Sequence, residues 1–273
     1  MTEERSSGIR LAYDCDPREL PSDLAARFFR LELGPEGASY LARAAQTRPG
    51  RAKTALHRAL RSWMSDFDAD GLLDMYPMHL LGTGGWRKLL GDRPRGRHLD
   101  IGAGAGHVTA TIAPLVGETV TTETSRVMAR KLRKRGFRCY EADLAESGVP
   151  EPSYDVITCL NVLDRCPRPK SLLAEARRAL APDGRLVLAV PLPFNAFFYE
   201  GPASRDQKER LDVSGGRWER AAAELVEKVL DPMGFDVETL SRVPYLCRGD
   251  SRHELYVLDD ALLVCKEKND YSR

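Results

Sequence analysis

The sequence has few of the features that mark membrane-spanning, fibrous or disulfide-stapled proteins. Aromatic residues make up only 7% of its 273 residues, and the longest apolar stretch, 186–199, is interrupted by two prolines and an asparagine. That stretch is too short and too broken to cross a bilayer. The opening residues, MTEERSSGIR, are charged and have no apolar core, so they do not predict a secretory signal.

Cysteine is sparse, and its spacing is informative. The six cysteines never form a C-x-x-C pair, which is the spacing that zinc sites and redox motifs use. Neither a metal site nor a small disulfide scaffold is therefore expected. Reduced, mostly buried thiols make a cytosolic location the default expectation.

Neither sign of charge dominates the chain. Lys+Arg number 41 and Asp+Glu 40, which leaves a net charge of +1. A net charge this close to zero gives no electrostatic reason to expect nucleic acid or an anionic membrane as the main partner. The composition, with 42% hydrophobic and 30% charged residues, is typical of a soluble globular protein. The length of 273 residues fits one large domain or one domain plus an extension.

Two regions differ in their apolar periodicity. In residues 1–92, apolar side chains recur with a spacing near 3.6 over 24–31 and 55–67, and 86–90 favours one more short helix. We therefore predict an N-terminal helical extension or cap over 1–92. A second, larger domain would then occupy 93–273.

From Arg97 onward, short β-type runs alternate with helical runs. The expected strands are 97–101, 120–123, 137–141, 154–160, 185–190, 235–242 and 254–266. The expected helices are 107–116, 127–135, 172–180 and 218–233. This alternation predicts an α/β fold with a seven-stranded, mostly parallel Rossmann-like sheet. The last two strands have no helix between them, so the final strand is expected to be antiparallel.

A glycine-rich turn follows the first expected strand directly. Residues 100–106 read D-I-G-A-G-A-G, and Glu123 ends the next strand nineteen residues after Gly104. Glycine is needed where the backbone passes close to a ligand, and a carboxylate at the second strand end can accept hydrogen bonds from ribose hydroxyls. The pattern predicts a site for an adenosine-containing ligand.

Other ligands fit this turn less well. A phosphate-binding loop needs a Lys-Ser/Thr pair after its glycines, but His107 and Val108 stand there. In the dinucleotide fingerprint G-x-G-x-x-G, the third glycine would fall at His107. A tight turn without any ligand stays open as an alternative, as does NAD.

The G-x-G-x-G string after Asp100 resembles motif I of class I S-adenosylmethionine methyltransferases. Residues 155–161, D-V-I-T-C-L-N, resemble the fourth-strand motif of that superfamily. Asp143 lies where such enzymes often hold the adenine amino group, although it could equally cap a helix. The resemblance implies S-adenosylmethionine as cofactor and S-adenosylhomocysteine as product.

Longer strings narrow the resemblance to one family. Residues 159–166, C-L-N-V-L-D-R-C, 242–250, R-V-P-Y-L-C-R-G-D, and 256–261, Y-V-L-D-D-A, are similar to the DREV family of protein-histidine methyltransferases, also called the methyltransferase-like protein 9 family. The similarity covers roughly residues 60–268. The first two strings are specific, whereas the glycine turn alone is not.

The resemblance implies an activity and a set of residues. The family methylates the pros nitrogen (Nδ1) of histidine in His-x-His segments of proteins and peptides, which gives 1-methylhistidine. The cofactor residues expected from motif position are Asp100, Gly102, Gly104, Glu123, Asp143 and Asn161. The residues expected to face the target imidazole are Asn161, Asp164, Tyr245 and Tyr256.

The chemistry of imidazole suits these residue types. Its neutral form is a competent nucleophile near pH 7, and a carboxylate that accepts the Nε2 proton leaves the lone pair on Nδ1. Asp164 is the candidate for that role. The alternatives are that Asp164 is a turn residue before Pro167 and that the two tyrosines are ordinary core aromatics.

Rival functions remain open at this point. A small-molecule methyltransferase acting on an imidazole metabolite would share the cofactor site, and a catalytically silent binding module would act through partner proteins. The five histidines are never separated by a single residue, so self-methylation of a His-x-His segment is not expected. We expect a monomer, and the segment 194–217 matches no string of the family.

Overall fold

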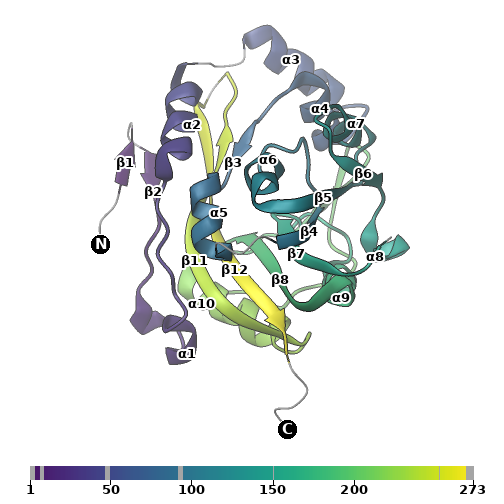
Figure 1. Ribbon diagram of the computed structural model, residues 1–273. Helices are drawn as coiled ribbons and strands as arrows, with labels where there is room; N and C mark the ends of the chain where they lie inside the picture. Colours follow the sequence, from purple (N-terminus) through teal and green to yellow (C-terminus); the bar gives the residue numbers. More distant parts are fainter. Residues whose placement is uncertain are drawn as a thin grey trace.

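The structure is a computed structural model that describes residues 4–6, 9–46, 50–91, 95–149, 151–251 and 253–268. Its centre is an eight-stranded sheet in the order β3-β11-β12-β8-β7-β4-β5-β6 (Figure 1). The strands of this sheet are β3 (Met78–His79), β4 (Arg95–Ile101), β5 (Val116–Glu123), β6 (Arg138–Glu141), β7 (Tyr154–Leu160), β8 (Leu180–Pro191), β11 (Phe235–Arg248) and β12 (Leu255–Glu267).

Parallel pairing runs through the middle of the sheet. β4 pairs in parallel with β5 and β7, β5 with β6, and β7 with β8. β12 is antiparallel to both β8 and β11. The predicted α/β fold with a mostly parallel sheet and an antiparallel last strand is confirmed. The predicted count of seven strands is one too low, because the two-residue strand β3 adds to the outer edge of β11.

The buried strands form where the sequence is apolar and β-branched. β7 has the predicted bounds, and five of its seven residues are buried, as expected for a strand covered on both faces. β11 continues six residues beyond the predicted end at residue 242. Its apolar residues go on through Leu246, and the antiparallel partner β12 satisfies its backbone over that length.

Helices cover both faces of the sheet. On one face, α9 (Pro169–Ala179) and α10 (Trp218–Leu225) bury apolar side chains against the core residues of β7 and β8. On the other face, α5 (Thr83–Leu90) and α6 (Thr109–Ile112) do the same. The edge near β6 carries α7 (Arg126–Lys134) and α8 (Leu144–Ser147).

Two predicted helices are shorter than expected. The helix predicted over 107–116 is only the single turn α6 followed by the 3-10 turn η2 (Ala113–Leu115). β-branched residues at 109, 111 and 112 lower its helix propensity, and Pro114 cannot donate a helical hydrogen bond. The helix predicted over 218–233 changes after α10 into the π-helical segment η3 (Val226–Leu230).

The first part of the N-terminal region differs from the prediction. It begins with the hairpin β1 (Glu4–Ser6) and β2 (Ile9–Leu11), followed by η1 (Pro17–Glu19) and the short α1 (Ser22–Ala25). The helix expected over 24–31 is wrong beyond Ala25, because the chain becomes extended there. The Phe29 N–H donates to the Leu240 carbonyl of β11 at 2.8 Å, so tertiary pairing outweighs the local apolar spacing.

Three helices complete that region: α2 (Gly34–Gln46), α3 (Arg51–Leu60) and α4 (Asp66–Leu73). The helix expected over 55–67 is divided between α3 and α4. Ser65 starts α4 as an N-cap, accepting the Asp68 N–H at 3.1 Å. The domain boundary predicted at 92–93 lies outside the described residues.

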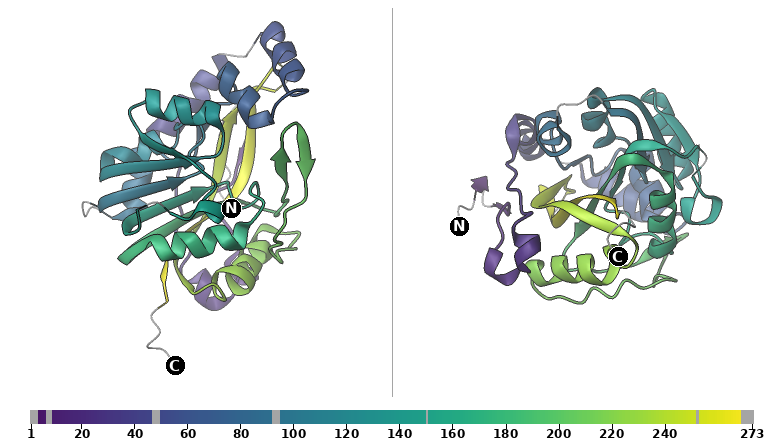
Figure 2. Two further views of the ribbon diagram at one scale, coloured as in Figure 1. Left: turned by 90° about the vertical axis from the view of Figure 1, so that its right-hand side faces the viewer. Right: turned by 60° about the horizontal axis from the view of Figure 1, so that its bottom comes forward.

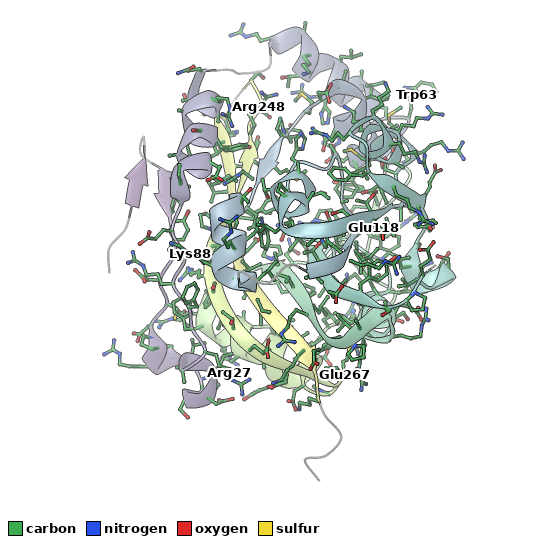
Figure 3. The ribbon with its side chains drawn as sticks, in the orientation of Figure 1. Arg27, Trp63, Lys88, Glu118, Arg248 and Glu267 are labelled. Carbon is green, nitrogen blue, oxygen red and sulfur yellow. The ribbon has the colours of Figure 1, made fainter. Side chains whose placement is uncertain are left out.

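The β11–β12 hairpin runs along most of the molecule, with Arg248 near one end and Glu267 near the other (Figure 3). The small hairpin of β9 (Phe198–Glu200) and β10 (Ala203–Arg205) projects beside the main sheet (Figure 2). Within the described residues, no helix is long and apolar enough to span a membrane.

Candidate active site

The glycine turn lies at the carboxyl end of β4, where open parallel sheets bind ligands. Gly102 and Gly104 have φ values of 65° and 56°, which disfavour other residues. A Cβ on Gly102 would come within 2.7 Å of Val162, whereas a Cβ on Gly104 would have no atom within 4 Å. Gly102 is therefore required for packing, and Gly104 leaves the backbone open to a ligand.

Asp100 supports this turn from inside the protein. Its side chain is buried and accepts hydrogen bonds from the Thr109 hydroxyl at 2.5 Å and the Thr158 hydroxyl at 2.6 Å. Burial raises its pKa to about 6 despite these hydrogen bonds. Because both carboxyl oxygens already bind protein groups, we propose that Asp100 anchors the turn to β7 rather than touching the cofactor.

Glu123 ends β5 beside the turn. Its carboxylate accepts the backbone N–H of Gly104 at 2.8 Å and that of Ser125 at 2.9 Å. Burial raises its pKa, while these backbone donors lower it. Oε1 also accepts the Thr124 hydroxyl at 3.5 Å, whereas Oε2 keeps a further acceptor site, so Glu123 can still bind the ribose hydroxyls for which it was predicted. An open backbone beside a half-buried carboxylate fits an adenosyl group.

Asp143 has the capping role that was open as an alternative. It precedes α8, and its Oδ1 accepts the Ala145 N–H at 3.0 Å. One carboxyl oxygen is thus committed to the helix, and the other is available for an adenine amino group.

Asn161 follows β7 in an unusual backbone conformation. Its φ is +56°, which is uncommon for a residue other than glycine. The backbone is held there by its N–H, which donates to the Ala189 carbonyl at 2.8 Å. Both polar atoms of the Asn161 side chain are buried without a hydrogen-bond partner among the described residues. Strain and unpartnered polar atoms together mark a functional position.

Asp164 lies three residues further along and is only 1% exposed. Its Oδ2 forms an ion pair with Arg165 at 2.7 Å, but its Oδ1 is buried and finds no partner in the part of the chain that the structure describes. Burial raises its pKa to about 6, and Arg165 opposes that shift. The free oxygen can therefore accept a hydrogen bond from a ligand.

A further acid, Asp260, was not among the predicted site residues. It lies on β12, is fully buried, and has neither carboxyl oxygen partnered within the described chain. Burial and, after it, the negative charge of Asp164 raise its pKa, and the Asn161 amide lowers it as a nearby hydrogen-bond donor, so the three residues form one electrostatic group. The sequence signal that could have identified Asp260 is a pair of adjacent acids, Asp259 and Asp260, in a largely apolar final strand. We call Asn161, Asp164 and Asp260 the transfer triad.

The two predicted tyrosines lie on the same sheet face as Asp260, as strand alternation requires. Tyr245 is buried, and its hydroxyl donates to the Met78 sulfur at 2.7 Å. Tyr256 is 36% exposed near the hairpin tip, where its hydroxyl donates to Asp250 at 3.0 Å. The structure brings neither hydroxyl into hydrogen-bond contact with the triad, so their role as ring-facing residues stays a prediction.

The segment 194–217 braces the turn that carries Asp164. Gln207 donates its side-chain N–H to the Leu163 carbonyl at 2.6 Å and to the Cys166 carbonyl at 2.8 Å. Phe197 donates its backbone N–H to the Asp164 carbonyl at 3.0 Å, and its ring lies under the Arg165 guanidinium. This segment matched no family string, yet it holds the acid in place.

The region around α4 covers the glycine turn from the other side. A small cavity there is lined by Asp70, Gly71, Met75, Met78, Ala105 and Met128. Phe67 of α4 packs edge-on against Tyr199 of β9, so α4 spans from the glycine turn to the segment that braces Asp164.

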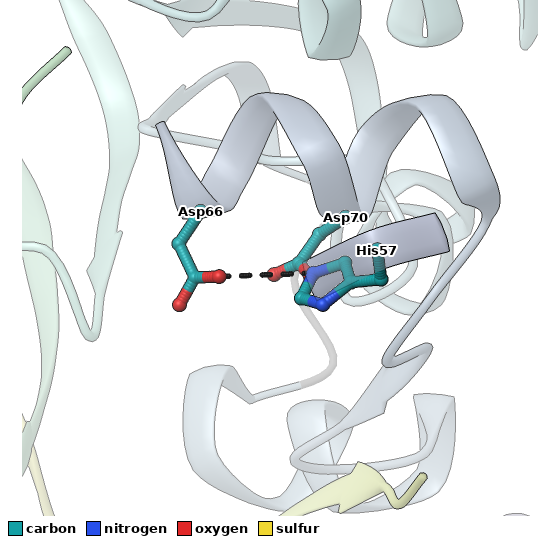
Figure 4. Close-up of side chains that lie close together, drawn as sticks. All are labelled: His57, Asp66 and Asp70. Atoms are coloured by element: carbon teal, nitrogen blue, oxygen red, sulfur yellow. Dashed lines mark hydrogen bonds and ion pairs between the residues drawn. The ribbon is translucent and has the colours of Figure 1, made fainter. Parts of the chain in front are cut away.

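His57, Asp66 and Asp70 form a second cluster of titratable groups between α3 and α4 (Figure 4). His57 Nε2 lies 2.6 Å from Asp70 Oδ1, and Arg61 pairs with Asp66 at 2.6 Å. Burial lowers the pKa of His57 and raises that of Asp70 to about 8. Because the members partner one another, we assign this cluster to joining the two helices.

The strand order, the glycine turn and the acid at the end of β5 define a class I S-adenosylmethionine-dependent methyltransferase. The DREV methyltransferase family model matches residues 13–267, and the chain belongs to that family. The match begins well before residue 60, where the recognisable strings start, so it includes most of the N-terminal region.

Curated relatives match only part of the chain. The uncharacterized methyltransferase YcgJ of Bacillus subtilis is 33% identical over 103 residues, which are 35% of this chain and 41% of YcgJ. The mitochondrial ubiquinone biosynthesis O-methyltransferase of Schizosaccharomyces pombe is 31% identical over 100 residues, 33% of this chain and 36% of that protein. Fusarielin synthase FSL1 of Gibberella zeae is 30% identical over 139 residues, 42% of this chain and 5% of the synthase.

Solved structures of two other proteins align with about two thirds of this chain at low identity. The crystal structure of YcgJ superposes with a TM-score of 0.46 and 16% identity, covering 68% of this chain and 98% of YcgJ. The N-methyltransferase NodS from Bradyrhizobium japonicum, in complex with S-adenosylhomocysteine, gives a TM-score of 0.40 and 18% identity, covering 67% of this chain and 84% of NodS.

Proposed function

We propose that the protein methylates the Nδ1 nitrogen of histidine in His-x-His segments of proteins or peptides, which gives 1-methylhistidine. The observation that carries this proposal is the buried, unpartnered Oδ1 of Asp164, three residues after Asn161, whose side-chain amide is also buried without a partner in the described chain. Buried polar atoms without partners are rare and costly, and a ring N–H of the substrate would satisfy the acid.

Asp164 would select the nitrogen that reacts. A neutral imidazole has one N–H and one lone pair. If Asp164 Oδ1 accepts the Nε2 proton as a hydrogen bond, the lone pair is on Nδ1, and that nitrogen becomes the nucleophile. The backbone hydrogen bond from Phe197 fixes the turn that carries the acid, so the ring is held in one orientation.

Asp164 would also stabilise the product. Methylation of Nδ1 turns the ring into an imidazolium, whose positive charge is favoured beside a buried carboxylate. With a pKa of about 6, Asp164 is mostly ionised at pH 7 and can then accept the Nε2 proton. Loss of that proton leaves a neutral methylated ring.

The cofactor would be held at the carboxyl end of β4 and β5. S-adenosylmethionine supplies an electrophilic methyl group on its sulfonium and is released as S-adenosylhomocysteine. Glu123 would accept the ribose hydroxyls, the backbone at Gly102 and Gly104 would lie against the nucleoside, and Asp143 would contact the adenine. Asn161 would border both the cofactor and the target ring. A cytosolic location and a monomeric state also remain predictions.

The test is methyl transfer from labelled cofactor to a His-Ala-His peptide. We expect label on imidazole, with digestion and chromatography against the two methylhistidine standards showing the Nδ1 isomer. A matched peptide with both histidines changed to alanine should stay unlabelled. Turnover on an imidazole metabolite but not on the peptide would instead favour the small-molecule methyltransferase. Cofactor binding without any transfer would favour the silent module.

A further inference from the structure

Asp260 is a buried acid in the candidate active site. The proposed reaction gives it no role. It is fully buried, and both carboxyl oxygens lack partners among the residues described. Its strand neighbour Asp259 is different, since it pairs with Arg242 through two hydrogen bonds, at 2.8 and 2.5 Å. An acid that merely completed the fold would be expected to have a similar partner.

The surroundings of Asp260 disfavour its ionised form. Burial is the main cause that raises the pKa of Asp260, and the negative charges of Asp164 and Asp259 raise it further. Arg165, the cation beside this group, is already paired with Asp164. On the β11 side the neighbours are Val243 and the buried Tyr245, neither of which carries positive charge. A buried carboxyl without a cation takes up a proton instead.

A protonated Asp260 has one O–H donor and one carbonyl acceptor. The Asn161 side chain is the complementary group, since it has an acceptor oxygen and N–H donors that are all unpartnered in the described chain. An acid and an amide can form two reciprocal hydrogen bonds, and the amide keeps one N–H free. That pairing would leave the ionised Asp164 for the target ring.

We propose that Asp260 is a neutral carboxylic acid that hydrogen-bonds the Asn161 carboxamide and fixes its orientation in the methyl-transfer site. It is a positioning residue, because it acts through Asn161. The inference rests on the proposed function for the identity of the substrate, but the state of Asp260 itself is independent of that substrate.

The test compares three variants. Asp260→Leu removes both hydrogen-bonding groups and should lower kcat on the His-Ala-His peptide by about tenfold or more. Asp260→Asn keeps a donor and an acceptor in the same shape, and should stay within about threefold of the wild type. The control Asp259→Asn alters the neighbouring acid on the opposite face and should leave kcat within about twofold.

Thermal unfolding separates a positioning role from a structural one. We expect Asp260→Leu to unfold close to the wild-type temperature, because removing the desolvation cost of a buried acid offsets the hydrogen bonds to Asn161 that are lost. Lower stability together with lower activity in both Asp260 variants would overturn the proposal. Wild-type turnover in Asp260→Leu would also overturn it, as would equal losses in the Asn and Leu variants.

Infrared difference spectroscopy tests the protonation state without any substrate. The wild type minus Asp260→Asn spectrum at pH 7 should show the C=O band of a protonated carboxylic acid. A carboxylate band in its place would overturn the proposal. If the wild type fails to methylate the peptide while the acid band is present, the proposed histidine substrate is wrong and the assignment of Asp260 as a neutral acid stands.

Discussion

The two halves of the active site differ in how their buried polar groups are partnered. On the cofactor side, Asp100 accepts two threonine hydroxyls and Glu123 accepts two backbone N–H groups. On the transfer side, every residue of the triad has at least one buried polar atom without a partner in the described structure. The acids on the cofactor side are therefore hydrogen-bonded within the protein. The transfer side has polar atoms that can still hydrogen-bond a substrate.

This difference separates residues that build the site from residues that act in it. Removing a satisfied buried acid leaves its donors unpaired and costs stability. Removing an unpartnered one relieves a desolvation cost, so the fold tolerates it while activity suffers. Measuring both stability and turnover for variants on the two sides therefore tests whether the sides differ in this way.

The largest effect is expected for Asp164→Ala. Loss of the acceptor for the ring proton and of the charge beside the imidazolium should lower kcat by about a thousandfold. Cofactor affinity should stay within about threefold, as measured by calorimetry. Near-wild-type turnover of this variant would disprove the role given to Asp164.

The next largest effect concerns the dependence of stability on pH. The pKa of Asp164 rises from 3.8 to about 6 on folding, so the native state binds the proton more tightly than the unfolded chain does. Its contribution is fully present below pH 3.8 and is lost as pH rises through 6, about 3 kcal/mol in total. Denaturant titrations from pH 3.5 to 7.5 should show this decline in the wild type relative to Asp164→Asn. Parallel curves for the two proteins would count against the shift.

On the cofactor side, the main expected effect of Asp100→Ala is a loss of protein stability. The Thr109 and Thr158 hydroxyls lose their buried acceptor, which we expect to cost about 2 kcal/mol of unfolding free energy. Urea unfolding would measure it, with Asp260→Leu as the contrasting buried-acid variant. If both variants destabilise the protein equally, the two halves do not differ in the way described.

The smallest of these effects is expected for Glu123→Gln. The amide keeps the shape but loses the charge and one acceptor for ribose, so the Kd for S-adenosylmethionine should rise by about tenfold. Isothermal titration measures this directly, and kcat at saturating cofactor should change little. An unchanged Kd would mean that Glu123 serves only the glycine turn.

The sequence alone predicts the sheet well, because its strands are apolar, β-branched and bounded by clear breaks. It predicts Asn161 and Asp164 through strings that resemble a family, and in the structure both have buried polar atoms without a partner among the described residues. It does not predict Asp260, whose strand neighbours on β8 and β11 are distant from it in the sequence or become adjacent only in the folded sheet. It also overstates helix in 24–31, where pairing with β11 fixes an extended backbone that local periodicity cannot report.

The extended segment around Phe28 has one more consequence. β11 is the penultimate strand of the sheet and is 14 residues long, and a bare edge of that length invites pairing with another chain. At one end β3 occupies this edge, and at the other Arg27 and Phe29 bond to Leu240. The N-terminal region thus covers part of the β11 edge and hinders edge-to-edge aggregation. We expect a shortened protein that begins after residue 30 to be less soluble, even with every proposed active-site residue intact.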